Sequence, residues 1–405
     1  MRPLALTLLI VALLRPMTST AQEPTTRADE AHDAREEKAK TLTPPTAGRI
    51  ERTLLALENG RLFERLLNPA EGFYPKIGTV TPGGGFGAGP GYRRPGALGE
   101  HADINAFAMG SLKQYWMLDA RLTFPRLADG HVFAEVYGRQ FDFPQEPFFG
   151  LGPTSDRANE SYYDLRSTEI GASGGVRPLP WLSFGTTVSR LTPHTRRADH
   201  SRSIDRFFDT TTLPGFDVET HFLKTRAFAD LNYREPRGNP RAGGRYLVSM
   251  EHYQDSDGGR YSFNRFEADL QQYISLLRNR RVIALRGLVS MTDPTSGADV
   301  PFFLQRTLGG PDDLRGFRRF RFRDRHLLLL QAEYRWEIFT AVDGAIFYDA
   351  GKVASTTGDL TLDDLESDYG IGFRFGTANG VFLRIEGAFG SSGGKHFIFR
   401  FGHVF

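Results

Sequence analysis

Apolar and polar side chains alternate along much of this 405-residue chain, most clearly near residue 330. Between Leu327 and Ile338 every second residue is apolar or aromatic. The residues between them include Gln331, Glu333, Arg335 and Glu337. After a short turn the pattern repeats, with Val342, Gly344, Ile346 and Tyr348 on one face and Asp343, Phe347 and Asp349 on the other. A period of two predicts β-strands, and aromatic outer faces with charged inner faces are typical of a membrane barrel.

The same alternation, bounded by turn residues, predicts about sixteen strands after Phe73. An even number is what a closed antiparallel barrel needs if both of its ends are to lie in the periplasm. The fold class is therefore all-β, a transmembrane β-barrel of about sixteen antiparallel strands preceded by a short amphipathic helix. The predicted strands span residues 73–81, 84–93, 102–111, 115–124, 130–142, 160–175, 180–192, 219–234, 243–254, 259–274, 280–292, 325–338, 342–351, 366–376, 379–389 and 395–405.

The lengths of the connections indicate which end of the barrel faces which compartment. Short connections follow even-numbered strands, at residues 126–130, 177–180, 339–341 and 377–380. Long connections follow odd-numbered strands, at residues 143–159, 193–218 and 293–324. Outer-membrane barrels have short periplasmic turns and longer outer loops. The long connections are therefore predicted to be the outer loops.

The N-terminal region divides into three predicted segments. Residues 1–21 have the pattern of a secretory signal peptide, because a charged start is followed by an apolar run and by small residues near Ala21. The apolar run is too short to span a membrane. Residues 22–46 are rich in charged residues, Thr and Pro, and are predicted to be a disordered tether. Residues 47–72 carry two apolar clusters separated by Gly60, which predicts an amphipathic helical segment before the barrel at 73–405.

Three pieces of sequence, in order, carry a resemblance to a known family. They are the loop from Leu308 to Phe317, with the letters LGGPDDLRGF, the strand QAEYR, and FYDAG at Phe347 to Gly351. Here the chain resembles outer-membrane assembly barrels of the BamA and TamA type, the bacterial surface antigen superfamily. The resemblance implies that the luminal motif Arg315, Gly316 and Phe317 folds back into the barrel. Arg315 is then expected to pair with Asp349 and Glu333, beside Phe347 and Gly351 on the barrel wall.

The resemblance covers the barrel only. The relatives carry periplasmic POTRA modules, and the 51 residues from 22 to 72 are too few for one such module plus the tether. The last strand places Phe397, Phe399, Phe401 and Phe405 on one face. The terminal Phe401 and Phe405 resemble the signal by which outer-membrane barrels are recognised for assembly. The implied location is the outer membrane of a Gram-negative bacterium. The implied partners are its lipid and lipopolysaccharide, and the barrel-assembly machinery during insertion.

Composition and motifs argue against nucleic-acid binding, a metal or cofactor site, and enzymatic activity. Lysine and arginine total 50 against 48 acidic residues, which gives no general case for nucleic-acid binding. The chain has no cysteine, and its histidines lack metal-ligand spacing, so no metal site or cofactor is expected. Two stretches match G-x-S-x-G, at residues 171–175 and 390–394, but neither is followed by a predicted helix. We therefore predict that the protein is not an enzyme.

An arginine run begins in the luminal motif, at Arg315, Arg318, Arg319, Arg321, Arg323 and Arg325. It could bind lipopolysaccharide phosphates, nucleic acid or the barrel's own acidic groups. Its place in the in-folding loop favours docking onto the barrel itself. A lumen lined by these positive charges would favour anions if the pore conducts.

The first two predicted strands are the weakest part of the pattern. They contain Pro75, Pro82 and Pro90 among seven glycines between residues 78 and 91, so amide donors and packing side chains are missing. We expect few ladder bonds where these strands meet the last strand. The helical segment is expected either to guard this seam or to rest on the membrane surface.

Two functions of different class remain. One is an insertase-like barrel that helps to place proteins or lipids in the outer membrane through the seam. The other is a passive pore or structural surface barrel with an internal loop plug. The sequence does not name a client protein.

Overall fold

The computed structural model describes residues 71–400, apart from residues 278, 340, 378–379 and 392. The predicted signal peptide and tether, the predicted helical segment up to residue 70, and Phe401 and Phe405 lie outside the described residues. Gly72, the last residue of the predicted helical segment, is the first residue of strand β1. The chain divides into two compact units, Met1–Arg52 and Thr53–Phe405, and the second unit contains every described residue.

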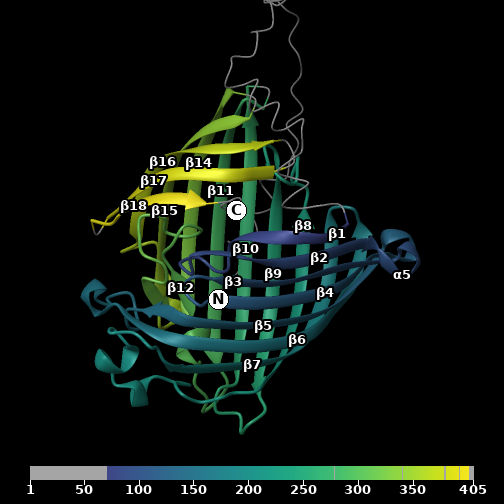
Figure 1. Cartoon of the computed structure of the whole chain (residues 1–405). Helices are drawn as coiled ribbons and strands as arrows, with labels where there is room; N and C mark the ends of the chain where they lie inside the picture. The colour runs from purple at the N-terminus through teal and green to yellow at the C-terminus, as the bar shows by residue number, and fades with distance from the viewer. Residues whose placement is uncertain (1–70, 278, 340, 378–379, 392, 401–405) are drawn as a thin grey trace, which may run out of the picture. The chain divides into compact units, whose positions relative to one another are not determined.

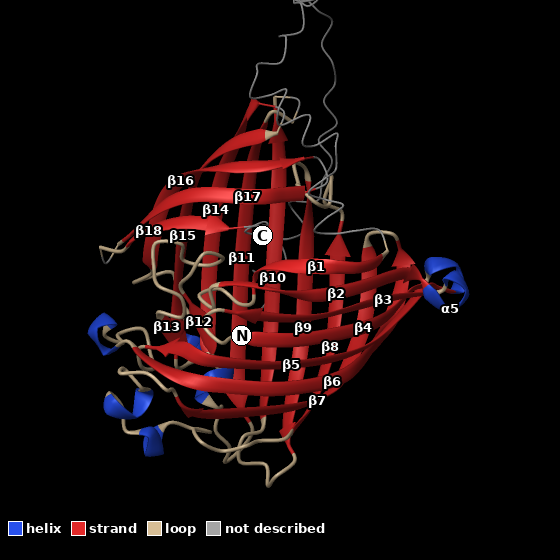
Figure 2. Ribbon diagram, in the orientation of Figure 1, coloured by secondary structure: helices blue, strands red, loops and turns tan. Residues whose placement is uncertain are grey.

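Sixteen strands form one antiparallel sheet, and each strand pairs with its neighbours in chain order. The sheet curls, so that the first strands pass in front of the upright strands β8 to β11 (Figures 1 and 2). This confirms the sixteen-stranded transmembrane barrel. The strands are β1 (Gly72–Thr79), β2 (Phe86–Gly96), β3 (Ala102–Ser111), β4 (Trp116–Leu127), β5 (Val132–Phe148), β6 (Ser161–Leu179), β7 (Leu182–Arg197), β8 (Phe222–Asn232), β9 (Gly243–Asp255), β10 (Phe263–Leu276), β11 (Arg281–Pro294), β14 (His326–Phe339), β15 (Val342–Ala354), β16 (Glu366–Thr377), β17 (Gly380–Gly390) and β18 (Lys395–Arg400).

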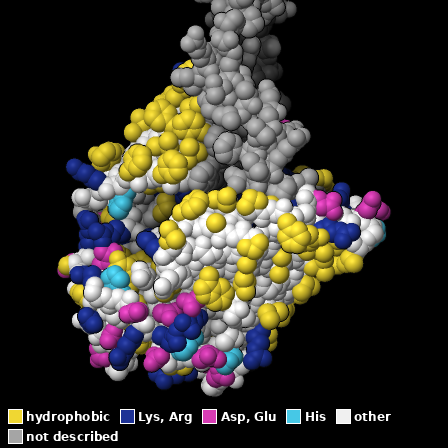
Figure 3. Space-filling model, viewed as in Figure 1, with side chains coloured by type: hydrophobic (Ala, Val, Ile, Leu, Met, Phe, Trp, Pro, Cys, Tyr) yellow, Lys and Arg dark blue, Asp and Glu magenta, His cyan; other side chains and the backbone are white. Residues whose placement is uncertain are grey.

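The alternation places charges inside and apolar groups outside, as expected. On β15, Asp349 is buried, whereas its neighbour Tyr348 is 52% exposed. On β14, Glu333 is buried and Leu330 is exposed. Apolar side chains cover much of the outer wall, and charged ones gather at its ends (Figure 3). The outer wall is thus the face that contacts lipid.

Connection lengths agree with the predicted orientation, although several strands are longer than expected. β5 continues to Phe148 and β7 to Arg197, so the outer loops shrink to residues 149–160 and 198–221. The predicted loops at 143–159 and 193–218 were wrong at their starts. The strand pairing continues past the apolar band, where the pairs are Glu146 with Tyr163 and Arg197 with Tyr163. Prolines and polar residues at 143–148 and 193–197 interrupt the alternation, so the sequence pattern did not show that these strands continue.

Short helical turns occupy the connections. They are α5 (Ala97–Glu100), η1 (Ala128–Gly130), η2 (Arg157–Asn159), η3 (Ile204–Arg206), η4 (Thr210–Thr212), η5 (Phe302–Leu304) and η6 (Thr357–Asp359). Within the described part of the chain, no helix is long and apolar enough to cross a membrane.

The longest connection, residues 295–325, enters the barrel and forms its own core there. It contains two short paired strands, β12 (Arg306–Leu308) and β13 (Phe322–Asp324), which the sequence did not predict. An apolar cluster joins this loop to the wall: Leu288, Leu308, Leu314, Phe317, Phe322, Leu327, Leu329 and Val353. A second cluster, rich in aromatic residues, connects the loop to the outer loop at 198–221 and to the ends of β5 and β6: Phe148, Tyr163, Ile204, Leu213, Phe302 and Phe303.

β1 and β18 are the two ends of the sheet order. Over the described ranges, no ladder pair joins these two strands. The seam between the first and last strands is therefore the least paired part of the described sheet.

Candidate functional site

The segment between β12 and β13, residues 309–321, is here called the luminal loop. It carries Arg315 into a pocket of acidic side chains on the inner wall. Arg315 Nε donates to Asp349 Oδ2 at 2.7 Å, and Nη2 donates to Asp349 Oδ1 at 2.8 Å. Its Nη1 donates to Glu333 Oε2 at 3.1 Å. The sequence named these three residues, and the structure brings them together.

Strand register explains why the acidic groups converge. Glu333 on β14 lies opposite Phe347 on β15, and Asp349 lies two residues further along β15 on the same face. The Phe347 ring lies beneath the guanidinium, with Arg315 Cζ 3.4 Å from the ring centroid. A guanidinium over an aromatic face gains a further attraction when water is excluded. Arg315 is thus held by two carboxylates and a ring.

Four more charged side chains complete this pocket, and the sequence analysis missed them. Glu386 on β17 accepts from Arg315 Nη1 at 3.3 Å. Arg335, Arg374 and Arg384 surround the carboxylates, and Arg374 is hydrogen bonded to both Glu333 and Glu386. We call this group the charged socket: Glu333, Asp349, Glu386, Arg335, Arg374 and Arg384. All of these side chains are buried, so removing one of them leaves an opposite charge poorly compensated.

Glycines let the luminal loop approach the wall closely. A β-carbon at Gly316 would lie only 2.5 Å from the backbone nitrogen of Gly390 on β17. A β-carbon at Gly351 would meet Leu328 O at 2.6 Å and the Leu308 side chain at 3.1 Å. Phe317 packs into the apolar cluster, with its ring 5.4 Å from that of Phe322. The tripeptide of Arg315, Gly316 and Phe317 therefore contacts the wall through a charged side chain, a glycine that permits close approach, and a buried aromatic ring.

The arginine run docks onto the barrel's own groups, as the preferred interpretation expected. Arg319 donates to Glu146 Oε2 at 2.8 Å, and Arg321 donates to Ser155 Oγ at 2.8 Å. Arg323 donates to the Phe302 carbonyl oxygen at 2.9 Å. Arg318 is paired with Glu160, and Arg325 donates to the Ser355 carbonyl oxygen. These arginines are occupied within the molecule.

The luminal loop also touches both sides of the seam. Asp312 is paired with Arg400 on β18 and lies 3.5 Å from Arg384. Arg319 Nη2 donates to Thr81 Oγ1, just after β1, at 3.0 Å. We call the two contacts, Asp312–Arg400 and Arg319–Thr81, the seam clasp. One loop thus connects the two ends of the sheet from inside.

Asp313, next to the clasp, is an unusual acid. Burial raises its pKa to about 7, although the nearby charge of Arg286 acts to lower it. Arg286 is already engaged by Asp269, at 2.9 Å, which leaves it less able to stabilise a second carboxylate. Asp313 therefore changes charge near neutral pH.

Comparison with known proteins decides the family. The model of the Omp85 superfamily domain matches residues 113–405. The chain belongs to the Omp85 superfamily. No curated protein matches it. The family is an outer-membrane insertase and translocator family, so this Omp85 barrel lies in the outer membrane of a Gram-negative bacterium.

Solved structures show the same fold at low identity. The chain is similar to BamA from Haemophilus ducreyi lacking POTRA domains 1–3, with 14% identity and a TM-score of 0.61, over 81% of this chain and 69% of that one. It is also similar to CdiB from Escherichia coli, with 12% identity and a TM-score of 0.50, over 78% of this chain and 58% of that one. The Omp85 chain described here thus spans part of each of these proteins.

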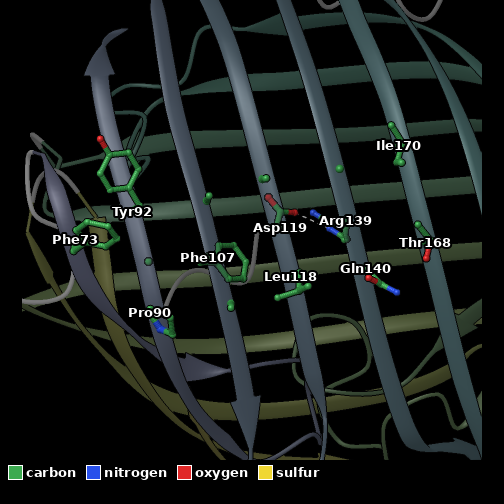
Figure 4. Close-up of a pocket in the computed structure, with 15 residues that line it drawn as sticks. Phe73, Pro90, Tyr92, Phe107, Leu118, Asp119, Arg139, Gln140, Thr168 and Ile170 are labelled. Carbon is green, nitrogen blue, oxygen red and sulfur yellow. Dashed lines mark hydrogen bonds and ion pairs between the residues drawn. The ribbon is translucent and has the colours of Figure 1, made fainter.

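The Omp85 barrel also has a groove of about 450 Å³ across its first six strands (Figure 4). Its floor includes small residues on neighbouring strands, such as Ala106, Ala120 and Gly138. Phe73 on β1, 83% exposed, stands at one end, and Ile170 on β6, 62% exposed, stands at the other. These exposed residues share the outward face, so the groove is open to lipid.

The Gly171–Gly175 stretch does not form a nucleophile elbow in this Omp85 barrel. β6 runs straight through it to Leu179, and Ser173 accepts a hydrogen bond from Thr187 Oγ1 at 3.1 Å. The other stretch includes residue 392, which lies outside the described residues. Among the described side chains, no group of three His, Asp or Glu residues is placed to hold a metal ion.

Proposed function

We propose that this barrel assists the insertion or translocation of proteins or lipids by opening between β1 and β18. The luminal loop is the element that controls this opening. The observation that carries the proposal is the seam clasp, because one loop binds Arg400 on the last strand and Thr81 beside the first. Opening the seam requires at least one of these contacts to break.

Weak pairing at the first strands supports an opening at this place. Pro75 lies opposite Pro90, so neither residue of that pair can donate an amide hydrogen. The β2–β3 ladder omits Gly89 and Pro90 between its paired positions at Ala88 and Gly91. An unpaired edge in lipid costs several kcal/mol per backbone group. A hydrophobic client strand that pairs with this edge would offset that cost.

The amphipathic segment at residues 47–72 is the covering element that we propose for the free edge. It ends at the first residue of β1 and carries two apolar clusters. A resting place on the membrane surface is its alternative, and cysteines at Leu57 or Phe63 and at Gly402 distinguish the two. Cross-linking in intact membranes supports the seam position, and its absence beside efficient control pairs on neighbouring strands supports the surface.

A passive pore or structural barrel is the alternative function. It is favoured by the completeness of the charged socket, which holds Arg315 with two carboxylates and a third at 3.3 Å. A loop fixed so firmly could serve as a permanent plug.

A reversible cross-link separates the two functions. The chain has no cysteine, so Asp312→Cys with Arg400→Cys can be joined by a short, reducible thiol-reactive linker. The wall-linked control places the same linker between Arg241, in the β8–β9 connection, and Asp343 on β15, which form an ion pair at 2.8 Å. In cells depleted of the native protein, we expect the seam-linked variant to alter the outer-membrane proteome and the reductant to restore it.

The wall-linked control should leave the outer-membrane proteome at the parent level. An unchanged proteome with the seam linked and with the protein depleted would rule out the insertion role. Single-channel conductance that persists in the linked protein would then favour the passive pore.

A further inference from the structure

Four polar side chains without a partner lie on one face of strands β5, β6 and β7. Gln140 is paired in the ladder with Thr168, and Thr168 is paired with Thr192, so these three side chains form a row across the strands. Arg190, which is exposed, lies two residues from Thr192 on the same face of β7. Across the described chain, none of the four side chains makes a hydrogen bond or an ion pair. These groups are therefore available to a polar ligand.

Strand parity places this row on the outer wall. Gln140 lies opposite Leu118, which is 43% exposed. Its neighbour Arg139 points the other way and donates to the buried carboxylate of Asp119 at 2.8 Å. Directly opposed residues of neighbouring strands share a face, so the two threonines point outward with Gln140. Gln140 and Thr168 line one end of the lipid-facing groove (Figure 4).

Arg190 is the cation of this group. It lies opposite Ile170, which forms the end of the groove and is 62% exposed, so the guanidinium also belongs to the outer face. The hydrogen bond from His221 and, more weakly, the charge of Arg190 lower the pKa of Asp257, but no ion pair joins Arg190 to this acid. Within the described residues, a positive charge at this level of the wall thus remains unpaired.

The row lies where the apolar wall ends and the outer headgroup layer begins. One step toward the outer loops, the outward residues are Trp116, Asp142, Arg166 and His194, which are paired one after another across β4 to β7. Arg166 Nε lies 2.9 Å from Asp142 Oδ2. A tryptophan and charged side chains on the lipid face are typical of the headgroup level. These residues lie at the strand ends opposite the short turns, so the row faces the outer leaflet.

On the other side of the row, toward the middle of the membrane, the groove offers space for acyl chains. Its volume is about 450 Å³, and its floor carries the small residues Ala106, Ala120 and Gly138. A β-carbon at Gly138 would have no atom of another residue within 4 Å, so the space above this glycine is open. Phe73 and Tyr92, with ring centroids 4.9 Å apart, form the far end. The groove thus joins a polar end at the headgroup level to an apolar floor.

We propose that the row and the groove together bind a phosphorylated glycolipid of the outer leaflet, as in the lipid A anchor of lipopolysaccharide. Arg190 binds a phosphate of the sugar head, where a guanidinium can form two parallel hydrogen bonds. Gln140, Thr168 and Thr192 exchange hydrogen bonds with hydroxyl and amide groups of the sugar. One acyl chain lies in the groove. A phospholipid without a sugar satisfies Arg190 but leaves most of the neutral side chains without partners.

The test uses the full-length protein in phosphatidylcholine nanodiscs that contain small, equal amounts of deep-rough lipopolysaccharide and phosphatidylglycerol. Native mass spectrometry counts the lipids that stay bound after release from the nanodisc. We expect the parent protein to retain lipopolysaccharide in preference to phosphatidylglycerol. Arg190→Gln should lower the retained lipopolysaccharide roughly fivefold, given about 1 kcal/mol for an arginine at an anionic membrane surface.

Two further variants test the sugar contacts and the groove separately. Thr168→Val with Thr192→Val removes both hydroxyls at nearly constant volume, and should lower lipopolysaccharide retention while leaving that of phosphatidylglycerol unchanged. Gly138→Leu fills the groove from the lipid side, where its β-carbon meets no other residue, and should also lower lipopolysaccharide retention. Folding of each variant is checked by heat-modifiable mobility.

The matched control is Arg281→Gln, which removes a lipid-facing arginine far from the groove. Arg281 lies at the short-turn end of β11, opposite Leu276, which is 39% exposed. It is exposed and, among the described residues, has no hydrogen bond or ion pair. This variant should retain lipopolysaccharide as the parent does.

Several outcomes would overturn the proposal. Parent-like retention in Arg190→Gln would remove the phosphate contact, and equal losses in Arg190→Gln and Arg281→Gln would mean that these arginines act only through general charge. Equal retention of both lipids by the parent, or parent-like retention in the double threonine variant, would remove the sugar assignment. Parent-like retention in Gly138→Leu would exclude the groove as the place of the acyl chain.

Discussion

At the residue scale, the charged socket is an ion-pair cluster whose net charge depends on Arg315. Without Arg315, the carboxylates of Asp349, Glu333 and Glu386 lose their shared cation. Water inside a plugged barrel compensates such a loss poorly. Arg315 is therefore the residue on which docking of the luminal loop depends.

Arg315→Ala should destabilise the folded barrel by about 3 to 5 kcal/mol, as expected when one partner of a buried ion pair is removed. Asp349→Ala should act in the same direction. Arg315→Lys should fall between parent and Ala, because an ammonium cannot form the two-pronged contact with Asp349. The measurement is the temperature at which the compact form is lost in heat-modifiable electrophoresis.

The matched control for these variants is Arg321→Ala, which removes an arginine of the same loop that contacts Ser155 outside the socket. Parent-like heat resistance of both Arg315→Ala and Asp349→Ala would show that the loop is not an internal strut.

The pH dependence of loop docking should come from Asp313. In the docked loop its pKa is about 7, whereas an exposed aspartate ionises near 4. Between about pH 4 and pH 7 the docked loop holds a proton that the released loop gives up, so docking weakens as the pH rises through this range. The groups that act on Asp313 are Arg286, Arg306, Asp312 and Asp349, and the two arginines oppose the shift.

The reporter for this prediction is a single cysteine at Leu314, a buried loop position in a cysteine-free chain. Thiol labelling should be faster at pH 7.5 than at pH 5 after correction for thiolate content. Asp313→Asn in the same background should abolish the difference, and a persisting difference would assign the pH effect to another group.

The sequence could predict one part of this site and not the rest. Arg315, Glu333 and Asp349 were found because a motif and strand parity both pointed to them. Glu386, Arg374 and Arg384 were missed, because parity places a side chain inside the barrel without telling which luminal group it meets. The Asp312–Arg400 contact joins residues 88 positions apart and depends on the path of the loop. Local sequence patterns do not predict contacts between residues so far apart in the chain.

At the element scale, the sixteen strands were predictable because each alternates between a lipid face and a luminal face. The strands β12 and β13 were missed because they do not alternate between a lipid face and a luminal face. They lie inside the barrel, and three residues each are too few to show a period. The ends of β5 and β7 beyond the apolar band were missed because prolines and polar residues interrupt the alternation there, at residues 143–148 and 193–197.

Restoring the missing amide donors of the β1–β2 hairpin should strengthen its strand pairing. Pro75→Thr with Pro90→Thr supplies the missing N–H groups of a directly opposed pair. We expect slower amide hydrogen exchange in β1 and β2, and reduced function in the depletion assay. Pro193→Thr on the wall strand β7, where Pro193 lies opposite Ser167, is the control and should change neither. Faster exchange in the double variant would contradict the role of these prolines.

At the scale of the whole molecule, the luminal loop fills the barrel and balances its charge. The lining is not a free positive surface, because the arginines of the loop are paired with wall and loop groups. The anion preference expected from the arginine run should therefore be weak in the intact protein. A clear preference for ions of one charge should appear only when the luminal loop is removed.

Replacing residues 311–320 by a short Gly-Ser linker removes Asp312 and Asp313 together with Arg315, Arg318 and Arg319. The wall that remains exposes Glu333, Asp349, Glu386 and Asp368 to the lumen against only Arg335, Arg374 and Arg384. We expect higher single-channel conductance and a preference for cations, because rings of carboxylates favour cation passage. The measurement is the reversal potential in planar bilayers under a potassium chloride gradient.

The control for the excision shortens the outer loop at residues 198–221 by the same number of residues and leaves the luminal loop in place. It should conduct like the parent. If the excised barrel conducts no better than the parent, the loop does not fill the conducting path. If it prefers anions, the remaining arginines dominate the wall, and the charge balance assigned to Arg315 and the socket carboxylates is wrong.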